Sequence, residues 1–203
     1  MESEPPHSPP GVPAAKRPRN AAATREAILR SAVEAFTRFG YDGAGVRDIA
    51  KDAGVTAMLV NRYFGSKEQL FAEAVDVSFA PRTVVTEDSA TPSRDIARSL
   101  VERTAPEADH LSPFLLMLRS VPNPRTAEIA RDGIERHVER EVTGMLTGEQ
   151  VSERSALALS VIAGVWMMRK VIGNRALVEA DAADLARRVE AVLRVLLEDP
   201  EPN

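Results

Sequence analysis

The chain contains no cysteine among its 203 residues, and only 4% of its residues are aromatic. The absence of cysteine excludes disulfides, thiolate catalysis and zinc sites that use cysteine ligands. The histidines His110 and His137 have no clear set of carboxylates beside them in the sequence, so no metal site is predicted. We therefore expect no metal and no other cofactor.

Long apolar runs are missing as well. The N-terminal segment is rich in proline and lacks the apolar stretch of a signal peptide, so export is not predicted. The longest uncharged run, 155–168, is too short to cross a bilayer. We expect a cytoplasmic protein that has no contact with a membrane.

Common catalytic motifs are also absent. The sequence has no glycine-rich loop that would cradle a phosphate, no H-E-x-x-H and no G-x-S-x-G. An enzyme whose helical body performs chemistry is therefore the weakest functional hypothesis.

The most informative segment is 46–67, VRDIAKDAGVTAMLVNRYFGSK, which predicts two short helices joined by a tight turn. Apolar residues recur at helical spacing from Val46 onward, and Gly54 supplies the turn position. Thr56 is placed to cap the second helix. Helices this short do not persist alone, so their neighbours must hold them and leave one face exposed. This is the logic of a helix-turn-helix; an ordinary helical hairpin would be the better interpretation if the motif stood alone.

The flanking segments predict two supporting helices. The upstream helix, 24–39, carries an apolar stripe and stops at Gly40. Ser66 is placed to cap a downstream helix that runs through Phe71, and we expect Lys67 at its start to point outward beside the second helix of the motif.

The span from Thr24 to Phe71 resembles the DNA-binding domain of the tetracycline-repressor (TetR) family of bacterial regulators. The resemblance depends on the order of four short motifs, Phe-x-x-x-Gly-Tyr, Arg-Asp-Ile-Ala, Ala-Gly-Val and Tyr-Phe-x-Ser-Lys, and it covers about a quarter of the chain. It implies an all-α fold, in which a three-helix helix-turn-helix domain precedes a helical domain for ligand binding and dimerisation. The predicted boundaries are 1–22 for an N-terminal arm, 23–70 for the DNA-binding domain and 71–203 for the body.

Matched residue by residue, the resemblance implies that Arg47, Ala57, Met58 and Asn61 face base edges or nearby backbone. It also implies that Tyr63 and Lys67 hold phosphates. The complete predicted DNA-binding set is Arg47, Thr56, Ala57, Met58, Asn61, Arg62, Tyr63 and Lys67.

Two positions depart from the family pattern. Asn61 stands where the family usually has a tyrosine, so its reach toward phosphate is shorter. Gly45 replaces the serine or threonine that usually opens the helix before the turn, and glycine is a slightly weaker cap.

Charge is distributed unevenly along the chain. Residues 16–67 contain ten Lys and Arg against five acids, which gives +5, although the whole chain carries −4. A basic region that coincides with the helix-turn-helix is what contact with phosphates requires.

Residues 1–22 contain six prolines and little to bury, so disorder is predicted. Lys16, Arg17 and Arg19 come directly before the first helix. They would either reach DNA as a flexible basic arm or belong to a solubilising tail, and the sequence does not decide between the two.

The remainder predicts a body of helices separated by proline and glycine. The expected helices are 93–104, 111–121, 125–146, 152–172 with Ser152 as its cap, and 182–198.

The last two of these helices predict a two-fold interface. The penultimate helix is apolar nearly all round, so it must be covered on more than one side, and a chain of this size has few helices to cover it. Together the last two helices of each chain would form a four-helix bundle, as the resemblance also implies; the alternative is a central core helix. The predicted interface residues are Ser160, Ala163, Gly164, Val189, Val192 and Leu196.

The resemblance also implies a pocket for an unknown small molecule in the body. The candidates for its lining are Phe114, Met117, Leu118, Met145, Trp166 and Met167, with Arg169 as a polar anchor. Methionine and aromatic residues at helical spacing are also ordinary core residues, and that alternative stays open.

Three functional hypotheses follow. The leading one is a dimeric repressor that a small-molecule effector releases from a palindromic operator in double-stranded DNA. The second is an activator or architectural DNA-binding protein that needs no effector, and the third is the enzyme set aside above.

Overall fold

The computed structural model describes residues 17–79, 91–108 and 113–198, and within these ranges every regular element is a helix. The predicted all-α fold is therefore confirmed. In chain order the elements are α1 (Arg17–Gly43), α2 (Val46–Asp52), α3 (Ala57–Phe64), α4 (Lys67–Phe79), α5 (Pro92–Arg103), α6 (Pro113–Ser120), α7 (Pro124–Ile134), η1 (Glu135–Glu139), α8 (Arg140–Thr143), α9 (Val151–Trp166), η2 (Met167–Val171), α10 (Arg175–Val178) and α11 (Ala182–Leu197), where η denotes a π-helical turn.

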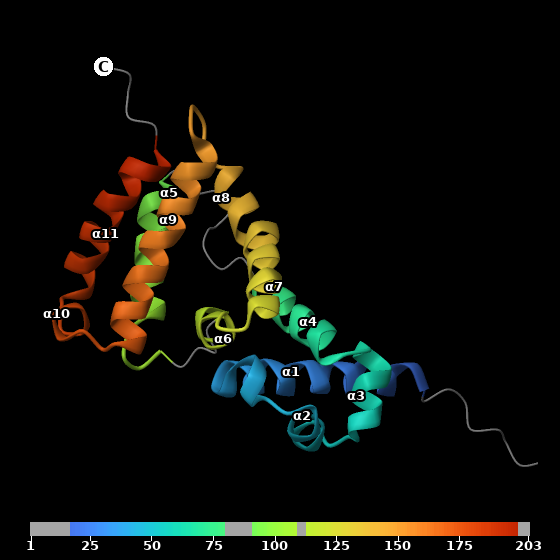
Figure 1. Cartoon of the computed structure of the whole chain (residues 1–203). Helices are drawn as coiled ribbons and strands as arrows, with labels where there is room; N and C mark the ends of the chain where they lie inside the picture. The colour runs from blue at the N-terminus through green and yellow to red at the C-terminus, as the bar shows by residue number, and fades with distance from the viewer. Residues whose placement is uncertain (1–16, 80–90, 109–112, 199–203) are drawn as a thin grey trace, which may run out of the picture.

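Two apolar cores organise the molecule. The first lies among α1 to α4, where Phe71 packs edge-on against the rings of Phe36 and Tyr41 at centroid distances of 5.1 and 5.3 Å. The second lies among α5, α9 and α11, which run side by side (Figure 1).

Helix α6 joins the two cores. Its residues Leu116 and Met117 are buried in the first core, while Phe114 and Leu115 pack against the second. In Figure 1, α1 runs across the lower half of the molecule, with α6 above it and α2 below it. The short helix α6 is therefore placed to pass a displacement of the body on to α1.

The N-terminal helix differs from the prediction at its start. It begins at Arg17, so the part of the predicted arm from 17 to 22 is helical, and only residues 1–16, with Lys16, lie outside the described residues. At its other end Gly40 has φ of 70°, which interrupts the helix where a stop was predicted.

The body also differs in detail. The predicted helix 125–146 is divided by η1, and the predicted helix 152–172 is α9 continued by η2. The latter begins after Gln150, which has a left-handed φ of 53°, so the assignment of Ser152 as its cap is wrong. The short helix α10 was not predicted.

One helical stretch, Val151–Val171, is long and apolar enough to cross a membrane, and only 22% of its apolar window is buried. The uncharged part of this stretch is the shorter run 155–168 noted in the sequence. Ser155 and Arg169 on this stretch are nevertheless buried inside the body, so the stretch is part of the packed domain. The apolar side chains on its other face, among them Leu157 and Val171, are exposed to solvent in the single chain.

Candidate nucleic-acid interface

The turn between α2 and α3 is fixed by backbone hydrogen bonds. Gly54 has φ of 69°, and the Val55 amide donates to the Ala50 carbonyl over 2.8 Å. Ser31 on α1 donates its hydroxyl to the Ile49 carbonyl over 3.0 Å and so ties α2 to the supporting helix. Both short helices are therefore held in place from outside, as their length requires.

Helix α3 is capped at its start and anchored on one face. The Thr56 hydroxyl accepts from the Leu59 amide over 3.4 Å, which confirms the predicted cap. Val60 and Phe64 are buried in the first core, and the Arg25 guanidinium lies 4.8 Å from the centroid of the Phe64 ring. Because one face is fixed in this way, the opposite face has a defined orientation.

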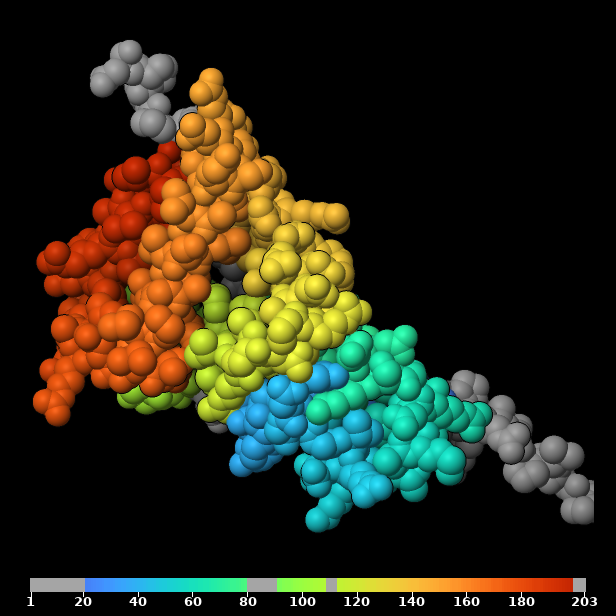
Figure 2. All heavy atoms as spheres, in the orientation of Figure 1, coloured from blue at the N-terminus to red at the C-terminus, as the bar shows by residue number. Residues whose placement is uncertain are grey.

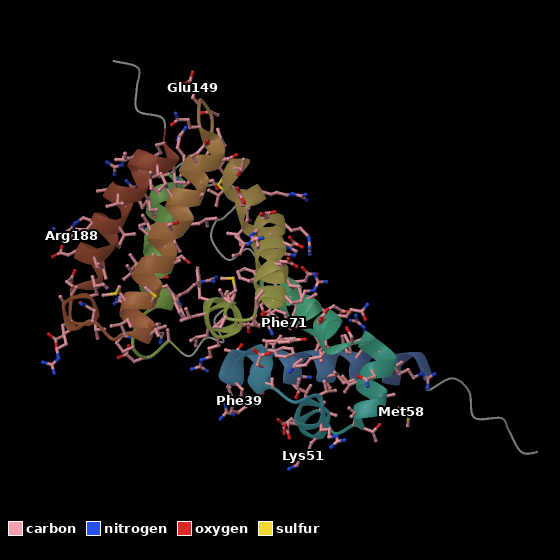
Figure 3. The ribbon with its side chains drawn as sticks, viewed as in Figure 1. Phe39, Lys51, Met58, Phe71, Glu149 and Arg188 are labelled. Atoms are coloured by element: carbon pink, nitrogen blue, oxygen red, sulfur yellow. The ribbon has the colours of Figure 1, made fainter. Side chains whose placement is uncertain are left out.

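That opposite face carries the predicted contact residues. Met58, Asn61 and Arg62 are exposed on α3, and Arg47 is exposed on α2 together with Lys51. Figure 3 shows Met58 and Lys51 at the end of the molecule formed by α2 and α3, away from the body. The exposed side chains of α2 and α3 thus include an amide, two arginines, a lysine and a thioether, a donor-rich set suited to DNA.

Three members of the predicted set are less accessible. Ala57 and Tyr63 are half-buried and pack against the first core. Lys67 is also half-buried, and its ammonium lies 4.4 Å from the centroid of the Tyr41 ring rather than pointing outward as expected. Burial lowers the pKa of the Lys67 ammonium, and the nearby Asp42 carboxylate opposes that shift.

The start of α2 confirms one departure from the family pattern. Gly45 precedes α2 without a side-chain cap. A Cβ at this position would lie 2.6 Å from an oxygen of the Asp48 carboxylate, so a larger residue would require this side chain to move.

A cluster of contacts that the sequence did not predict joins this domain to the body. Arg119 at the end of α6 donates to the carbonyls of Thr37 and Arg38, the last turn before Gly40. The hydroxyl of Ser120 accepts from the Tyr41 amide over 3.2 Å. We call the contacts of Arg119, Ser120, Asn123 and Arg125 with α1 and α4 the joint.

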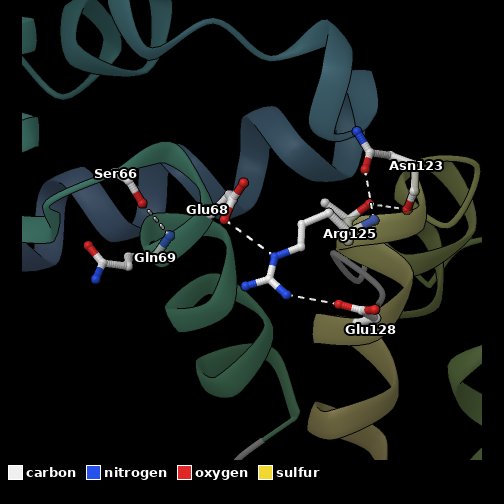
Figure 4. A network of polar contacts seen from close by, with 7 residues as sticks. Ser66, Glu68, Gln69, Asn123, Arg125 and Glu128 are labelled. Carbon is white, nitrogen blue, oxygen red and sulfur yellow. Dashed lines mark hydrogen bonds and ion pairs between the residues drawn. The ribbon is translucent and has the colours of Figure 1, made fainter.

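The other half of the joint is polar and lies at the surface. The Asn123 amide donates to the Asp42 carboxylate over 2.9 Å. Arg125 lies between Glu68 on α4, at 3.4 Å, and Glu128 on its own helix, at 2.8 Å (Figure 4). Hydrogen bonds to Glu128 and Glu68 raise the pKa of the Arg125 guanidinium. Because these polar pairs are exposed, they add little to the free energy of unfolding, and their main effect is to orient the DNA-binding domain relative to the body.

Two glycines permit close approach between the domain and the body. A Cβ on Gly40 would lie 2.4 Å from the Arg119 carbonyl oxygen, and one on Gly133 would lie 2.4 Å from a methyl carbon of Val75. The sequence predicted a stop at Gly40 but gave no sign that α6 would pack directly on it.

The predicted pocket residues are only partly brought together. Phe114 and Trp166 stack at a centroid distance of 5.3 Å, and Trp166 lies in the second core. Met117, in contrast, is buried in the first core. The side chains of Leu118, Met145 and Met167 are exposed.

Arg169, the predicted anchor, is buried and bound to its own chain. Its guanidinium donates to the carbonyls of Val101 and Leu177, each over 2.8 Å, and to the Thr104 hydroxyl over 2.7 Å. Burial lowers the pKa of Arg169. These bonds fasten η2 to α5 and α10, so the observed role of this residue is structural.

Figure 2 shows a hollow in the body between α9 on one side and α6 and α7 on the other. Among the described residues no group of three or more His, Cys, Asp or Glu side chains is placed to hold a metal ion.

The predicted interface residues on α9 and α11 differ in exposure: some lie at the surface, and one lies in the second core. On α9, Ser160 is exposed and Ala163 is half-buried, and a Cβ on Gly164 would meet no atom within 4 Å. On α11, Val192 is 50% exposed and Leu196 is half-buried, but Val189 is only 6% exposed and lies in the second core. Val189, which was predicted to lie at the interface, therefore packs inside its own chain.

Several apolar residues on these helices were missed. Leu157, Met167 and Val171 are exposed along α9 and η2, and Val195 is 73% exposed on α11. Leu157 lies three residues from Ser160, Val195 three from Val192, and Met167 three from Gly164; this spacing is the signal that would have placed them on the same faces.

Comparison with known proteins agrees with this architecture. Residues 28–74 match the family described as bacterial regulatory proteins, tetR family, and residues 92–197 match the family described as tetracyclin repressor-like, C-terminal domain. The second match alone covers just over half of the chain.

Individual relatives match over about a third of the chain. The transcriptional regulator RutR of Escherichia coli K12 is 37% identical over 79 residues, which are 37% of this chain and 37% of RutR. The repressor NicS of Pseudomonas putida is 34% identical over 64 residues, 32% of this chain and 30% of NicS. The chain thus spans about a third of the length of these curated relatives.

Solved structures match over nearly the whole chain. A TetR-family regulator from Streptomyces coelicolor A3 is 25% identical with a TM-score of 0.62, over 92% of this chain and all of that one. The multidrug binding protein EbrR, solved with imidazole, shares the fold at 19% identity and a TM-score of 0.63, over 92% of this chain and 97% of EbrR. This family comprises transcriptional regulators and not enzymes, and the chain belongs to it: it is a member of the TetR family of helix-turn-helix transcriptional regulators.

Proposed function

We propose that the protein is a homodimeric repressor that binds a palindromic operator and leaves it when a small molecule enters the body. The observation that carries the proposal is the rigid helix α3, whose outer face presents Met58, Asn61 and Arg62 beside the basic residues of α2. An eight-residue helix fixed on its inner face and polar on its outer face suits insertion into a major groove.

Dimerisation is supported by the uncovered apolar surface of α9 and α11. Leu157 and Met167 on one helix and Val192 and Val195 on the other are exposed, and Gly164 leaves room for the backbone of a second helix. A second copy related by a two-fold axis would cover the same residues on both chains. It would also account for the apolar stretch Val151–Val171 without a membrane.

The two-fold arrangement has a consequence for DNA. It would place two copies of α3 on one side of the duplex, where successive major grooves lie roughly 34 Å apart. Each chain then reads one half-site, and the affinity of the dimer depends on the distance between the two copies of α3.

Effector binding is supported by the hollow between α9 and α6 (Figure 2) and by the stacked rings of Phe114 on α6 and Trp166 on α9. Phe114 belongs to α6, the helix whose end holds α1 through the joint. A molecule that packs on Phe114 would therefore act on α6 directly. Its differential affinity for two positions of α6 would set the size of the response.

The test uses the purified full chain and DNA from beside its own gene. Footprinting should show a protected palindrome, and binding should weaken steeply with salt, as phosphate contacts require. Fractionated extracts or a small-molecule library should contain a compound that releases the DNA. Specific binding that no compound relieves, with activation of a reporter, would favour the effector-independent alternative, and absence of any sequence-specific binding would refute the proposal.

A further inference from the structure

Met58 is the most exposed large apolar residue among those that the structure describes, at 79%. It lies in the first turn of α3, two residues after the cap residue Thr56. Most of the other large exposed apolar residues lie in the body, where the proposed two-fold interface covers several of them. No such cover is available for Met58, because it lies at the far end of the molecule (Figure 3).

The exposure of Met58 is imposed by the structure around it. The amides of Leu59 and Val60 both donate to the Thr56 carbonyl, at 2.9 and 3.2 Å, so the first turn is fully formed. Val60 and Phe64 hold the opposite face in the first core. Met58 therefore has no route inward, and its thioether is presented at a fixed position on the outer face.

The surroundings of Met58 are polar and carry positive charge. Asn61 and Arg62 follow it by three and four residues and share its face, and Arg47 and Lys51 come from α2. This charge suits a phosphate backbone, but a thioether is only a weak acceptor and has no donor for a phosphate or a base edge. In the major groove the apolar feature that distinguishes one base from another is the C5 methyl group of thymine.

We infer that Met58 is a specificity-determining residue that packs against the C5 methyl of a thymine in each half-site of the operator. The inference rests on the proposed DNA-binding function and adds the identity of one base feature that the protein reads. Asn61 and Arg62 supply the hydrogen bonds around this apolar contact, and Met58 supplies a preference that hydrogen bonds alone do not give.

The test removes the methyl group without changing base pairing. An operator is first selected from random duplexes with the wild-type chain, and each thymine is then replaced by deoxyuridine at symmetric positions of both half-sites. At one position per half-site, wild-type affinity should fall about fourfold for each methyl removed, the factor expected for one buried methyl-sized group. Deoxyuridine at the other positions is the internal control.

Variants connect that position to Met58. Met58→Ala should bind the unmodified operator more weakly and should lose the response to deoxyuridine at that position, while it keeps any response elsewhere. Met58→Leu retains an apolar side chain and should restore most of the methyl sensitivity. Circular dichroism and thermal unfolding of both variants should match the wild type, because Met58 contributes little to the core.

The outcomes separate this inference from the proposed function. If the wild-type chain binds a selected operator but no deoxyuridine position changes its affinity, Met58 reads no methyl group and the inference is overturned while the DNA-binding function stands. If Met58→Ala keeps the full methyl response, another residue makes the contact. If no operator can be selected at all, the proposed function fails and this inference fails with it.

Discussion

The DNA-binding region and the body place their apolar residues differently. In α1 to α4 most large apolar side chains point into one core, and the exposed surface of α2 and α3 is mainly polar apart from Met58. In α9 and α11 each helix has one apolar face in the second core and a second apolar face in solvent, with Leu157 and Val195 more than half exposed. In the DNA-binding region a single chain therefore buries most of its large apolar side chains. In the body a single chain leaves several of them exposed.

This difference indicates which part of the molecule needs a partner. The DNA-binding region has side-chain caps at the start of α3 and α4, a turn fixed by backbone hydrogen bonds and a closed core, so its outer surface is free to contact DNA. The body has an exposed apolar face on α9 and α11, which the second copy in the proposed dimer would cover. The joint connects the two through Gly40, where α6 touches α1.

The largest effect is expected from a charge on the uncovered face of the body. Val192→Glu would place a carboxylate opposite its own symmetry copy, which should cost about 3 kcal/mol or more in dimerisation and yield monomers in sedimentation. Val121→Glu is the matched control, because Val121 is 48% exposed against 50% for Val192 and lies outside this face. If sedimentation gives the same mass for both variants, the interface does not include Val192.

The joint should be broken by a methyl group at Gly40. Gly40→Ala combines a positive φ with a Cβ 2.4 Å from the Arg119 carbonyl, whereas Gly54→Ala has a similar φ and nothing within 4 Å. We expect thermal unfolding to show a loss of about 1 kcal/mol for Gly54→Ala and clearly more for Gly40→Ala. If both variants lose the same stability, α6 does not press on α1 at this point.

Loss of Arg47 should affect sequence preference. Arg47→Ala is expected to lose about 1 to 3 kcal/mol of operator binding and much less on random DNA, because Arg is the strongest hydrogen-bonding base reader in the set. Competition binding on both DNAs checks this. Equal losses on both would reassign Arg47 to phosphate.

Trp166 should report the effector, because it is the sole tryptophan in the chain and stacks on Phe114 of α6. A compound that releases DNA is expected to change Trp166 emission, with coupling of about 1 to 3 kcal/mol between the two ligands. Trp166→Phe keeps a ring in the core and should weaken effector binding more than operator binding. Constant emission during release would place the pocket away from α6.

The smallest effect is expected from Lys67. Its ammonium lies over Tyr41 at the start of α4, so Lys67→Ala should weaken all DNA sequences alike by less than about 1 kcal/mol and reduce the salt dependence by about one charge. Arg103→Ala, an exposed cation on α5, should leave both unchanged. A sequence-dependent loss for Lys67→Ala would assign it to a base.

Much of the DNA-binding region was predictable because its signals are local. The caps at Thr56 and Ser66 and the stop at Gly40 follow from residue types and spacing, and each is observed. Periodicity also located the main helices of the body. It did not reveal η1, η2 or α10, because interruptions of this kind depend on tertiary packing.

The site in the body was harder to predict for a different reason. Periodicity identifies apolar faces but does not say whether a face meets its own chain or another, so Val189 was assigned to the interface although it lies in the core. The joint was invisible, because Arg119 and Ser120 lie about eighty residues from the backbone groups that they bind. Likewise, the sequence did not reveal that Arg169 would be saturated by its own chain.

The most direct test of the central claim is the mass of the protein on its operator, measured by sedimentation equilibrium with a duplex that contains both half-sites. Two chains of 22.1 kDa should bind one duplex, and the free protein should sediment as the same pair at micromolar concentration. A free monomer that binds a full operator as one chain per duplex, with wild-type affinity retained in Val192→Glu, would contradict the account.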